Sequence, residues 1–248
     1  MNLLGCNFDE VTQEGAVKWS EDWLANSETS GYITTVNVAI LMMMRSDKTL
    51  TKFIENSALV VADGLPLIWL SKLLGRPLPE RVAGIDLMQD MVRNAAETGK
   101  SVYLMGAKPG TVKKVAERFK IENPALILAG VDDGYYTKEQ EAERVKNIRE
   151  SGADLLVVAM GVPRQENFLN DNWDDLGVKL AIPVGGSFDV IAGETKRAPV
   201  WMQKTGMEWF YRMCQEPRRL FKRYLVTNTQ FIGLGLMSIF QTKLLKRS

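Results

Sequence analysis

The segment Ala153-Asp-Leu-Leu-Val-Val-Ala-Met-Gly-Val-Pro-Arg-Gln-Glu166 reads as a buried strand, a glycine turn and the polar start of a helix. Its residues 155–159 form a continuous apolar run, which is typical of a central parallel strand covered on both faces. Gly161 suits the turn, and Pro163 suits the first turn of the next helix. Because ligands bind at the carboxyl ends of strands in open parallel sheets, we expect Gln165 at a binding edge. An ordinary strand-to-helix joint is the alternative.

The rest of the chain repeats this alternation of strand and helix. Further strand-like runs lie at residues 32–35, 59–62, 102–105, 126–131 and 178–184. Helical patterns separate them, which gives roughly six βα units. We therefore predict an α/β fold with a doubly wound, mostly parallel sheet.

Composition limits the chemistry that this chain can perform. Its 248 residues are 46% apolar, which allows one large core or a core with a small appendage. The chain has no histidine, which excludes histidine bases, Ser-His-Asp triads and His-ligated metals, so acid–base chemistry falls chiefly to Asp or Glu. Cys6 and Cys214 lack CxxC spacing, so we expect neither a disulfide nor a zinc site, and a reducing compartment. The amino terminus lacks the pattern of a secretory signal.

Charge divides the chain into two parts. Up to Lys196 there are 21 Lys and Arg against 28 Asp and Glu, a net of −7, whereas from Arg197 there are 10 against 2, a net of +8. The second part alternates aromatic and basic residues, and its apolar run 231–240 is about half the length of a membrane-spanning helix. We predict a core of residues 1–196 and a basic helical appendage of residues 197–248 that lies on an anionic membrane surface. A helical cap on the sheet, with a solvated basic face, is the alternative.

Two polar residues end predicted strands of the first half. Asp63 follows the run 59–62 and precedes Gly64, where a carboxylate is well placed to act as a base. Asn37 occupies another strand-to-helix corner. For both residues the alternative is a helix cap.

Two charged groups allow opposite interpretations. Arg81 would clamp a diphosphate, since a guanidinium pairs with phosphate through two hydrogen bonds, or it would form a salt bridge to Glu80 or Asp86. The pair Asp132-Asp133 invites comparison with an Asp-x-Asp metal site, but adjacent carboxylates before a glycine favour a turn.

Glycine turns provide further candidate contacts. The turn that begins at Gly106 precedes a helix and would receive a phosphate, although it matches no standard phosphate-loop motif. The turn Gly185-Gly186 follows the last strand. Ser187 and Asp189 beyond it would form hydrogen bonds to a nucleotide base or ribose.

Several segments together resemble one family. In order, they are Asp63-Gly64, Arg81-Val-Ala-Gly-Ile-Asp86, Asp133-Gly-Tyr135, Ala159-Met-Gly-Val-Pro-Arg-Gln-Glu166, Val184-Gly-Gly-Ser-Phe-Asp-Val-Ile-Ala-Gly193, Lys196-Arg-Ala-Pro199, Glu208-Trp-Phe-Tyr-Arg212 and Glu216-Pro-Arg-Arg219. Each motif alone is weak, but their joint order over nearly the whole chain resembles the WecG/TagA/CpsF glycosyltransferases.

The resemblance implies an inverting transferase with a Rossmann-like core. It implies transfer of an N-acetylmannosamine-type sugar from a UDP-sugar donor to undecaprenyl-diphosphate-linked N-acetylglucosamine. The expected place is the cytoplasmic membrane face, with peripheral attachment, and the product would enter a wall or surface polymer. No cofactor, metal or nucleic acid is implied, and a homo-oligomer is compatible with the sequence. The rival interpretation is a regulatory or scaffold module that binds a UDP-sugar without turning it over.

The resemblance also assigns roles to residues. Asp63 would take the proton of the acceptor hydroxyl. Pocket residues would be Thr35, Asn37, Arg81 and Gln165, and the residues expected to meet the lipid diphosphate are Arg212, Arg219 and Lys222. Two positions depart from the family pattern: Ala39 stands where many relatives have Glu, and Pro183 where they usually have Gly.

Overall fold

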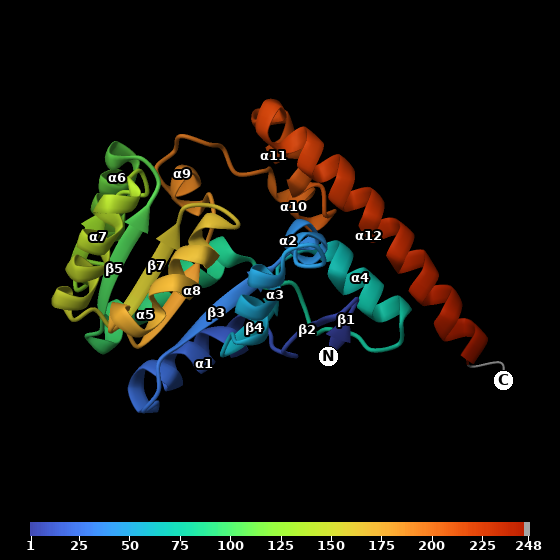
Figure 1. Cartoon of the computed structure of the whole chain (residues 1–248), viewed down its shortest axis with the longest axis horizontal. Helices are drawn as coiled ribbons and strands as arrows, with labels where there is room; N and C mark the ends of the chain where they lie inside the picture. Colours follow the sequence, from blue (N-terminus) through green and yellow to red (C-terminus); the bar gives the residue numbers. More distant parts are fainter. Residues whose placement is uncertain (246–248) are drawn as a thin grey trace. The chain divides into compact units, whose positions relative to one another are not determined.

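The computed structural model describes residues 1–245 (Figure 1). The strands are β1 (Asn2–Leu3), β2 (Cys6–Asn7), β3 (Gly31–Val36), β4 (Leu59–Ala62), β5 (Ser101–Gly106), β6 (Ile127–Asp132), β7 (Leu155–Ala159) and β8 (Leu180–Pro183). The helices are α1 (Gln13–Asn26), α2 (Val38–Met43), α3 (Lys48–Glu55), α4 (Leu65–Leu73), α5 (Gly84–Thr98), α6 (Pro109–Glu122), α7 (Lys138–Ser151), α8 (Arg164–Leu176), α9 (Ser187–Ile191), α10 (Val200–Lys204), α11 (Glu208–Gln215) and α12 (Pro217–Leu245).

Six strands form one sheet in the order β4-β3-β8-β7-β5-β6. The pairs β3–β8, β8–β7, β7–β5 and β5–β6 are parallel. β1 and β2 form a separate antiparallel pair. The predicted α/β class with a Rossmann-like, mostly parallel sheet is confirmed.

The central strands follow from the apolar runs of the sequence. All five residues of β7 are buried, and β7 pairs with β5 on one side and β8 on the other. A strand covered on both faces needs apolar side chains at every position, which is why β7 shows no alternation. The expected bounds of β4 and β7 are confirmed residue for residue.

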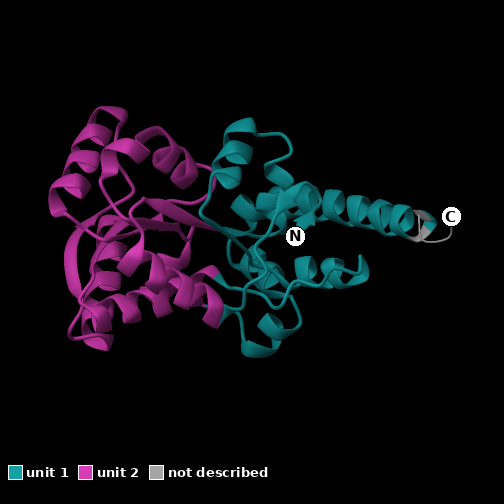
Figure 2. Cartoon of the chain, turned by 90° about the horizontal axis from the view of Figure 1, so that it is seen from below, with its two compact units in different colours: residues 1–13, 35–83, 197–248 teal, residues 14–34, 84–196 magenta. Residues whose placement is uncertain are grey.

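The chain divides into two compact units (Figure 2). Unit 1 contains residues 1–13, 35–83 and the described residues from 197 onward, and unit 2 contains residues 14–34 and 84–196. The carboxyl-terminal helices thus share a unit with β4, α2 and α4. The predicted division into residues 1–196 and 197–248 stays a prediction.

The carboxyl-terminal helices pack within unit 1. α12 runs along α2 and α4 (Figure 1). Its Leu220 and Tyr224 are buried against Ala39 of α2, with Trp209 of α11 beside them. Further along, Gly235 lies against Leu70 of α4. α12 is 29 residues long, far longer than the apolar run 231–240 within it. In the described part of the chain, no helix combines the length and the apolar character that crossing a membrane requires.

Candidate active site

Asp63 lies at the carboxyl end of β4, in unit 1. Its backbone N–H donates to the carbonyl of Val36 at 2.9 Å, which ties it to the end of β3. The N–H of Val82 donates to the carbonyl of Ala62 at 2.9 Å, so the loop that carries Arg81 runs beside the same strand end. Backbone hydrogen bonds therefore bring Asp63 and Arg81 together, although 18 positions separate them.

Arg81 bridges two carboxylates of unit 1. Its Nε lies 3.2 Å from Oδ1 of Asp63, and its Nη2 lies 2.7 Å from Oε2 of Glu208 on α11. Burial lowers the pKa of the guanidinium, but the two carboxylates raise it, and the net pKa is raised above its ordinary value. Arg81 is thus a fixed positive charge beside Asp63, as a diphosphate clamp requires. The sequence suggested Glu80 or Asp86 as the salt-bridge partner of Arg81, whereas the structure pairs Arg81 with Asp63 and Glu208. Glu80 instead accepts a hydrogen bond from the backbone N–H of Gln13.

The structure separates the two capping interpretations. The N-cap position of α4 is Gly64, one residue after Asp63. Asn37 does cap α2, since its Oδ1 accepts from the N–H of Ile40 at 3.1 Å. Thr35 is buried near the end of β3. Asn37 and Thr35 therefore lie near the strand end that holds Asp63, and their binding roles stay predictions.

Three basic residues of the carboxyl-terminal segment also belong to unit 1. Arg212 is half-buried on α11, and Arg219 and Lys222 are exposed on α12. Arg219 pairs with Glu216 through two contacts of 2.7 and 2.9 Å. A surface ion pair of this kind contributes only about 0–1 kcal/mol, so Glu216 holds Arg219 weakly.

In unit 2, Gln165 organises two glycine turns. The side chain of Gln165 is buried, and its Oε1 accepts from the N–H of Gly161 at 3.2 Å and of Gly185 at 2.9 Å. It therefore joins the turns after β7 and β8. At the end of the neighbouring β5, Gly106 has a φ of 137°, and a Cβ there would lie 2.3 Å from the carbonyl oxygen of Ala159. Only glycine fits this close approach of two strand ends.

The last glycine turn places its two polar residues differently. Ser187 is buried, and its hydroxyl donates to the carbonyl of Val184 at 2.7 Å, which holds the turn itself. Asp189 lies in the first turn of α9 and is half-buried. Its backbone carbonyl accepts from the N–H groups of Glu194 and Thr195. The structure thus gives Ser187 a local role, and ligand binding by Asp189 stays a prediction.

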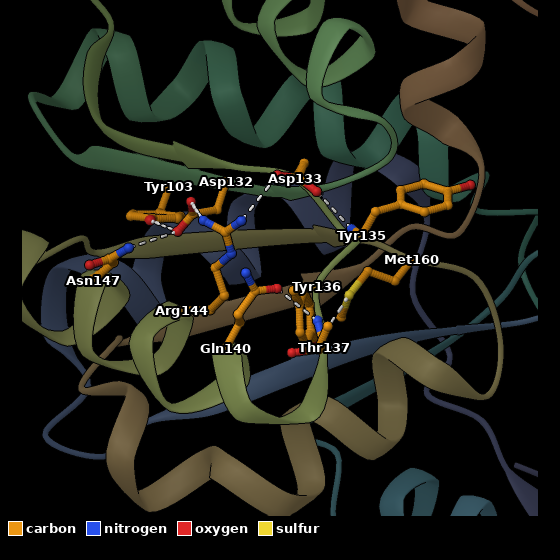
Figure 3. A network of polar contacts seen from close by, with 10 residues as sticks. All are labelled: Tyr103, Asp132, Asp133, Tyr135, Tyr136, Thr137, Gln140, Arg144, Asn147 and Met160. Carbon is orange, nitrogen blue, oxygen red and sulfur yellow. Dashed lines mark hydrogen bonds and ion pairs between the residues drawn. The ribbon is translucent and has the colours of Figure 1, made fainter.

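A polar network fixes the end of β6 (Figure 3). Arg144 on α7 pairs with Asp132 and with Asp133, the second at 3.1 Å. Tyr103 donates its hydroxyl to Oδ2 of Asp132 at 2.6 Å, and Asn147 donates to the same oxygen at 3.4 Å. Burial and the bond to Asp132 raise the pKa of Tyr103 far above its ordinary value, so Tyr103 acts as a permanent donor.

Asp133 forms the turn that the sequence favoured. Its Oδ1 accepts from the N–H of Tyr135 at 2.8 Å, as expected for an aspartate turn (Figure 3). Gly134 between them bonds to the carbonyl of Ala107, beside Gly106, so the turns after β5 and β6 touch. Within residues 1–245, no group of three or more acidic or thiol side chains is arranged to hold a metal ion.

A cavity of about 290 Å³ lies between α6 and the end of β6. Its wall consists of Pro109, Val112, Lys113, Ala116, Glu117, Val131, Asp132 and Asp133. None of the predicted site residues lines this cavity.

Sequence reasoning missed two contributors to these sites. Glu208 stood in a quoted motif without a role, and its spacing of four from Arg212 was the available signal, because residues four apart share a helix face. Gly161 and Gly185 were predicted only as turn residues, without a role for their N–H groups. Their shared bond to Gln165 depends on tertiary contacts that no local pattern shows.

Comparison with known proteins identifies the class. The model of the glycosyl transferase WecG/TagA/CpsF family matches residues 1–245, so the chain belongs to this family of glycosyltransferases, as its motifs predicted. The chain is similar to the N-acetylglucosaminyldiphosphoundecaprenol N-acetyl-beta-D-mannosaminyltransferase of Bacillus subtilis (strain 168). The two are 32% identical over 209 residues, which cover 84% of this chain and 80% of the relative.

Proposed function

We propose that this glycosyltransferase moves N-acetylmannosamine, or a closely related sugar, from a UDP-sugar to undecaprenyl-diphosphate-linked N-acetylglucosamine, with inversion at the anomeric carbon. The acceptor and the sugar follow the printed activity of the similar Bacillus subtilis protein. The observation that carries the proposal is the pairing of Asp63 with Arg81 at the end of β4.

The reaction needs one base and one site of positive charge. Asp63 takes the proton of the acceptor hydroxyl while the oxygen of that hydroxyl forms a bond to the anomeric carbon. The bond between that carbon and the diphosphate oxygen breaks on the opposite side, and UDP leaves with the electron pair. General base catalysis contributes about 10²- to 10⁴-fold in rate.

Arg81 supplies the positive charge that the reaction needs. Its guanidinium stays protonated and offers hydrogen bonds to the charge that develops on the departing diphosphate. Arg212, Arg219 and Lys222 add positive charge for the diphosphate of the lipid acceptor. Gly106, Gln165 and Asp189 of unit 2 are proposed to contact the UDP-sugar.

Replacing Asp63 by Asn tests the base. Asparagine keeps the shape of the side chain but accepts no proton, so turnover falls by about 10²- to 10⁴-fold. Release of UDP with a short-chain lipid-diphosphate acceptor measures turnover. The matched control is Asp175→Asn, which removes an exposed carboxylate of unit 2. Turnover of Asp63→Asn near that of the control would remove Asp63 from the mechanism. Retained UDP binding in the native protein without any UDP release would instead favour a non-catalytic binding module.

We also propose that the protein attaches peripherally to the cytoplasmic face of the membrane through α12. Among the described side chains of this helix, seven large apolar ones are more than half exposed: Phe221, Leu225, Ile232, Leu236, Met237, Phe240 and Leu244. Arg218, Arg219 and Lys222 are exposed near its start. A helix with exposed apolar groups and basic residues fits an interfacial position on anionic lipid.

The double substitution Leu236→Glu with Phe240→Glu tests this attachment. Burial of a Leu or Phe side chain contributes about 1.5–3 kcal/mol, so binding to anionic phospholipid vesicles weakens by more than about tenfold. Vesicle flotation measures the effect. Ile121→Glu on α6 is the control, because Ile121 is exposed but lies in unit 2. Equal binding of the double variant and the control would refute the role of α12.

A further inference from the structure

Arg81 is shared unequally between two carboxylates. Its contact with Glu208 is 2.7 Å long, whereas its contact with Asp63 is a single bond of 3.2 Å through Nε. Glu208 lies 127 positions further along the chain. The carboxyl-terminal segment therefore supplies the closer partner of the guanidinium beside the proposed base.

The position of Glu208 is set by its neighbour Trp209. The ring of Trp209 packs against Tyr224 of α12 with centroids 5.7 Å apart. Tyr224 and Leu220 are buried against Ala39 of α2, and Trp209 is part of this cluster. The start of α11 is thus anchored by apolar packing, and Glu208 projects from an anchored turn rather than from a loose loop.

This arrangement limits how Arg81 can meet Asp63. A guanidinium and a carboxylate reach their strongest pairing when two nitrogens face two oxygens. Because Nη2 is held by Glu208, the pairing of Arg81 with Asp63 consists of the Nε contact. The three groups carry one positive and two negative charges. The two carboxylates therefore share the cation, and Arg81 contacts only one oxygen of Asp63.

We propose that Glu208 is a positioning residue for the transfer reaction: it holds Arg81 so that Asp63 stays an effective base. The inference rests on the proposed function, because it takes Asp63 as the group that removes the acceptor proton. Glu208 itself acts through Arg81. Since Arg212 lies four residues further on α11, the same anchor sets the face from which Arg212 projects.

The test compares Glu208→Gln and Glu208→Asp in the full-length protein. Glutamine carries no charge to hold Arg81, so Arg81 turns toward Asp63. We expect kcat to fall by about ten- to a hundredfold, which corresponds to the loss of one charge-assisted hydrogen bond. Arg81 also loses a competing anion, so UDP binds as tightly as to the wild type or more tightly. Aspartate restores the charge, and its kcat recovers toward the wild-type value. UDP release gives kcat, and calorimetry gives the Kd of UDP.

Two controls separate the outcomes. Glu150→Gln breaks an exposed ion pair of α7 with Lys146 and leaves turnover unchanged. Wild-type turnover in Glu208→Gln overturns the inference, and so does a joint loss of turnover and UDP binding, which indicates that Glu208 only maintains the fold. Asp63→Asn is measured in parallel. If it loses turnover while Glu208→Gln keeps it, only the role of Glu208 fails; if Asp63→Asn keeps turnover, the proposed base itself fails.

Discussion

Replacing Arg144 by Leu should destabilise unit 2 strongly. Arg144 is the cation that pairs with both Asp132 and Asp133 (Figure 3). The side chains of Arg144 and Asp132 are only 21% and 10% exposed. Removing one partner of a buried ion pair leaves an uncompensated charge and costs about 3–5 kcal/mol. The hydroxyl of Tyr103 still bonds to Asp132 in the variant, so we expect the lower end of this range.

The same helix offers a matched control. Arg149 on α7 pairs with Asp175, and both side chains are more than half exposed. Exposed pairs contribute about 0–1 kcal/mol, so Arg149→Leu should change stability little. Urea unfolding followed by circular dichroism gives the free energy of unfolding for each variant.

A second substitution identifies the cause of the loss. Asp132→Asn in the Arg144→Leu background removes the unpaired charge but keeps the shape of the side chain, so it should recover part of the lost stability. If Arg144→Leu costs no more than Arg149→Leu, the network does not stabilise the end of β6. If Asp132→Asn deepens the loss instead, the unpaired charge is not its cause.

Two further predictions concern the backbone and the response to acid. Gly106→Ala should cost at least about 2 kcal/mol in urea unfolding, because its Cβ would meet the Ala159 carbonyl and its φ is positive, whereas Gly110→Ala meets no atom within 4 Å and should be neutral. For Asp154, burial raises the pKa, but hydrogen bonds from Ser101 and the nearby lysine lower it more, and the net pKa lies below its ordinary value of 3.8. Its stabilising effect is therefore present above that value and is lost as the pH falls through the lower native value. Asp154→Asn should be less stable than the wild type at pH 7, and the difference should shrink in acid; a difference independent of pH would contradict this.

The sheet could be predicted from the sequence because its strands are rich in apolar and β-branched residues, and β4 and β7 are apolar throughout. β4 and β7 were delimited correctly, since strands buried on both faces stand out from polar turns. Asp63 was predicted for the same reason, as a polar residue directly after such a run, whereas Gln165 was predicted as part of the helix start beyond the glycine turn that follows β7. Local sequence patterns were sufficient to predict the bounds of an element when all its residues are buried.

The carboxyl-terminal segment shows where local patterns fail. The buried described residues of α12 are Leu220, Tyr224, Thr227 and Gly235, so apolar residues also occur on its exposed side. The apolar run 231–240 therefore marks only part of a 29-residue helix. The pairing of Arg81 with Glu208 was equally hidden, because it depends on how residues 127 positions apart meet in the folded chain.

The small side chain at position 39 has a consequence for how this family diversifies. Ala39 is 2% exposed and is covered by Leu220 and Tyr224 of α12. A glutamate at this position would act as a wedge, because a longer, charged side chain could not occupy the same space. Relatives with a carboxylate here should therefore carry different residues at the equivalents of 220 and 224, and the three positions should covary as a set. Exchanging position 39 alone between such relatives should be harmful, whereas exchanging all three together should be tolerated.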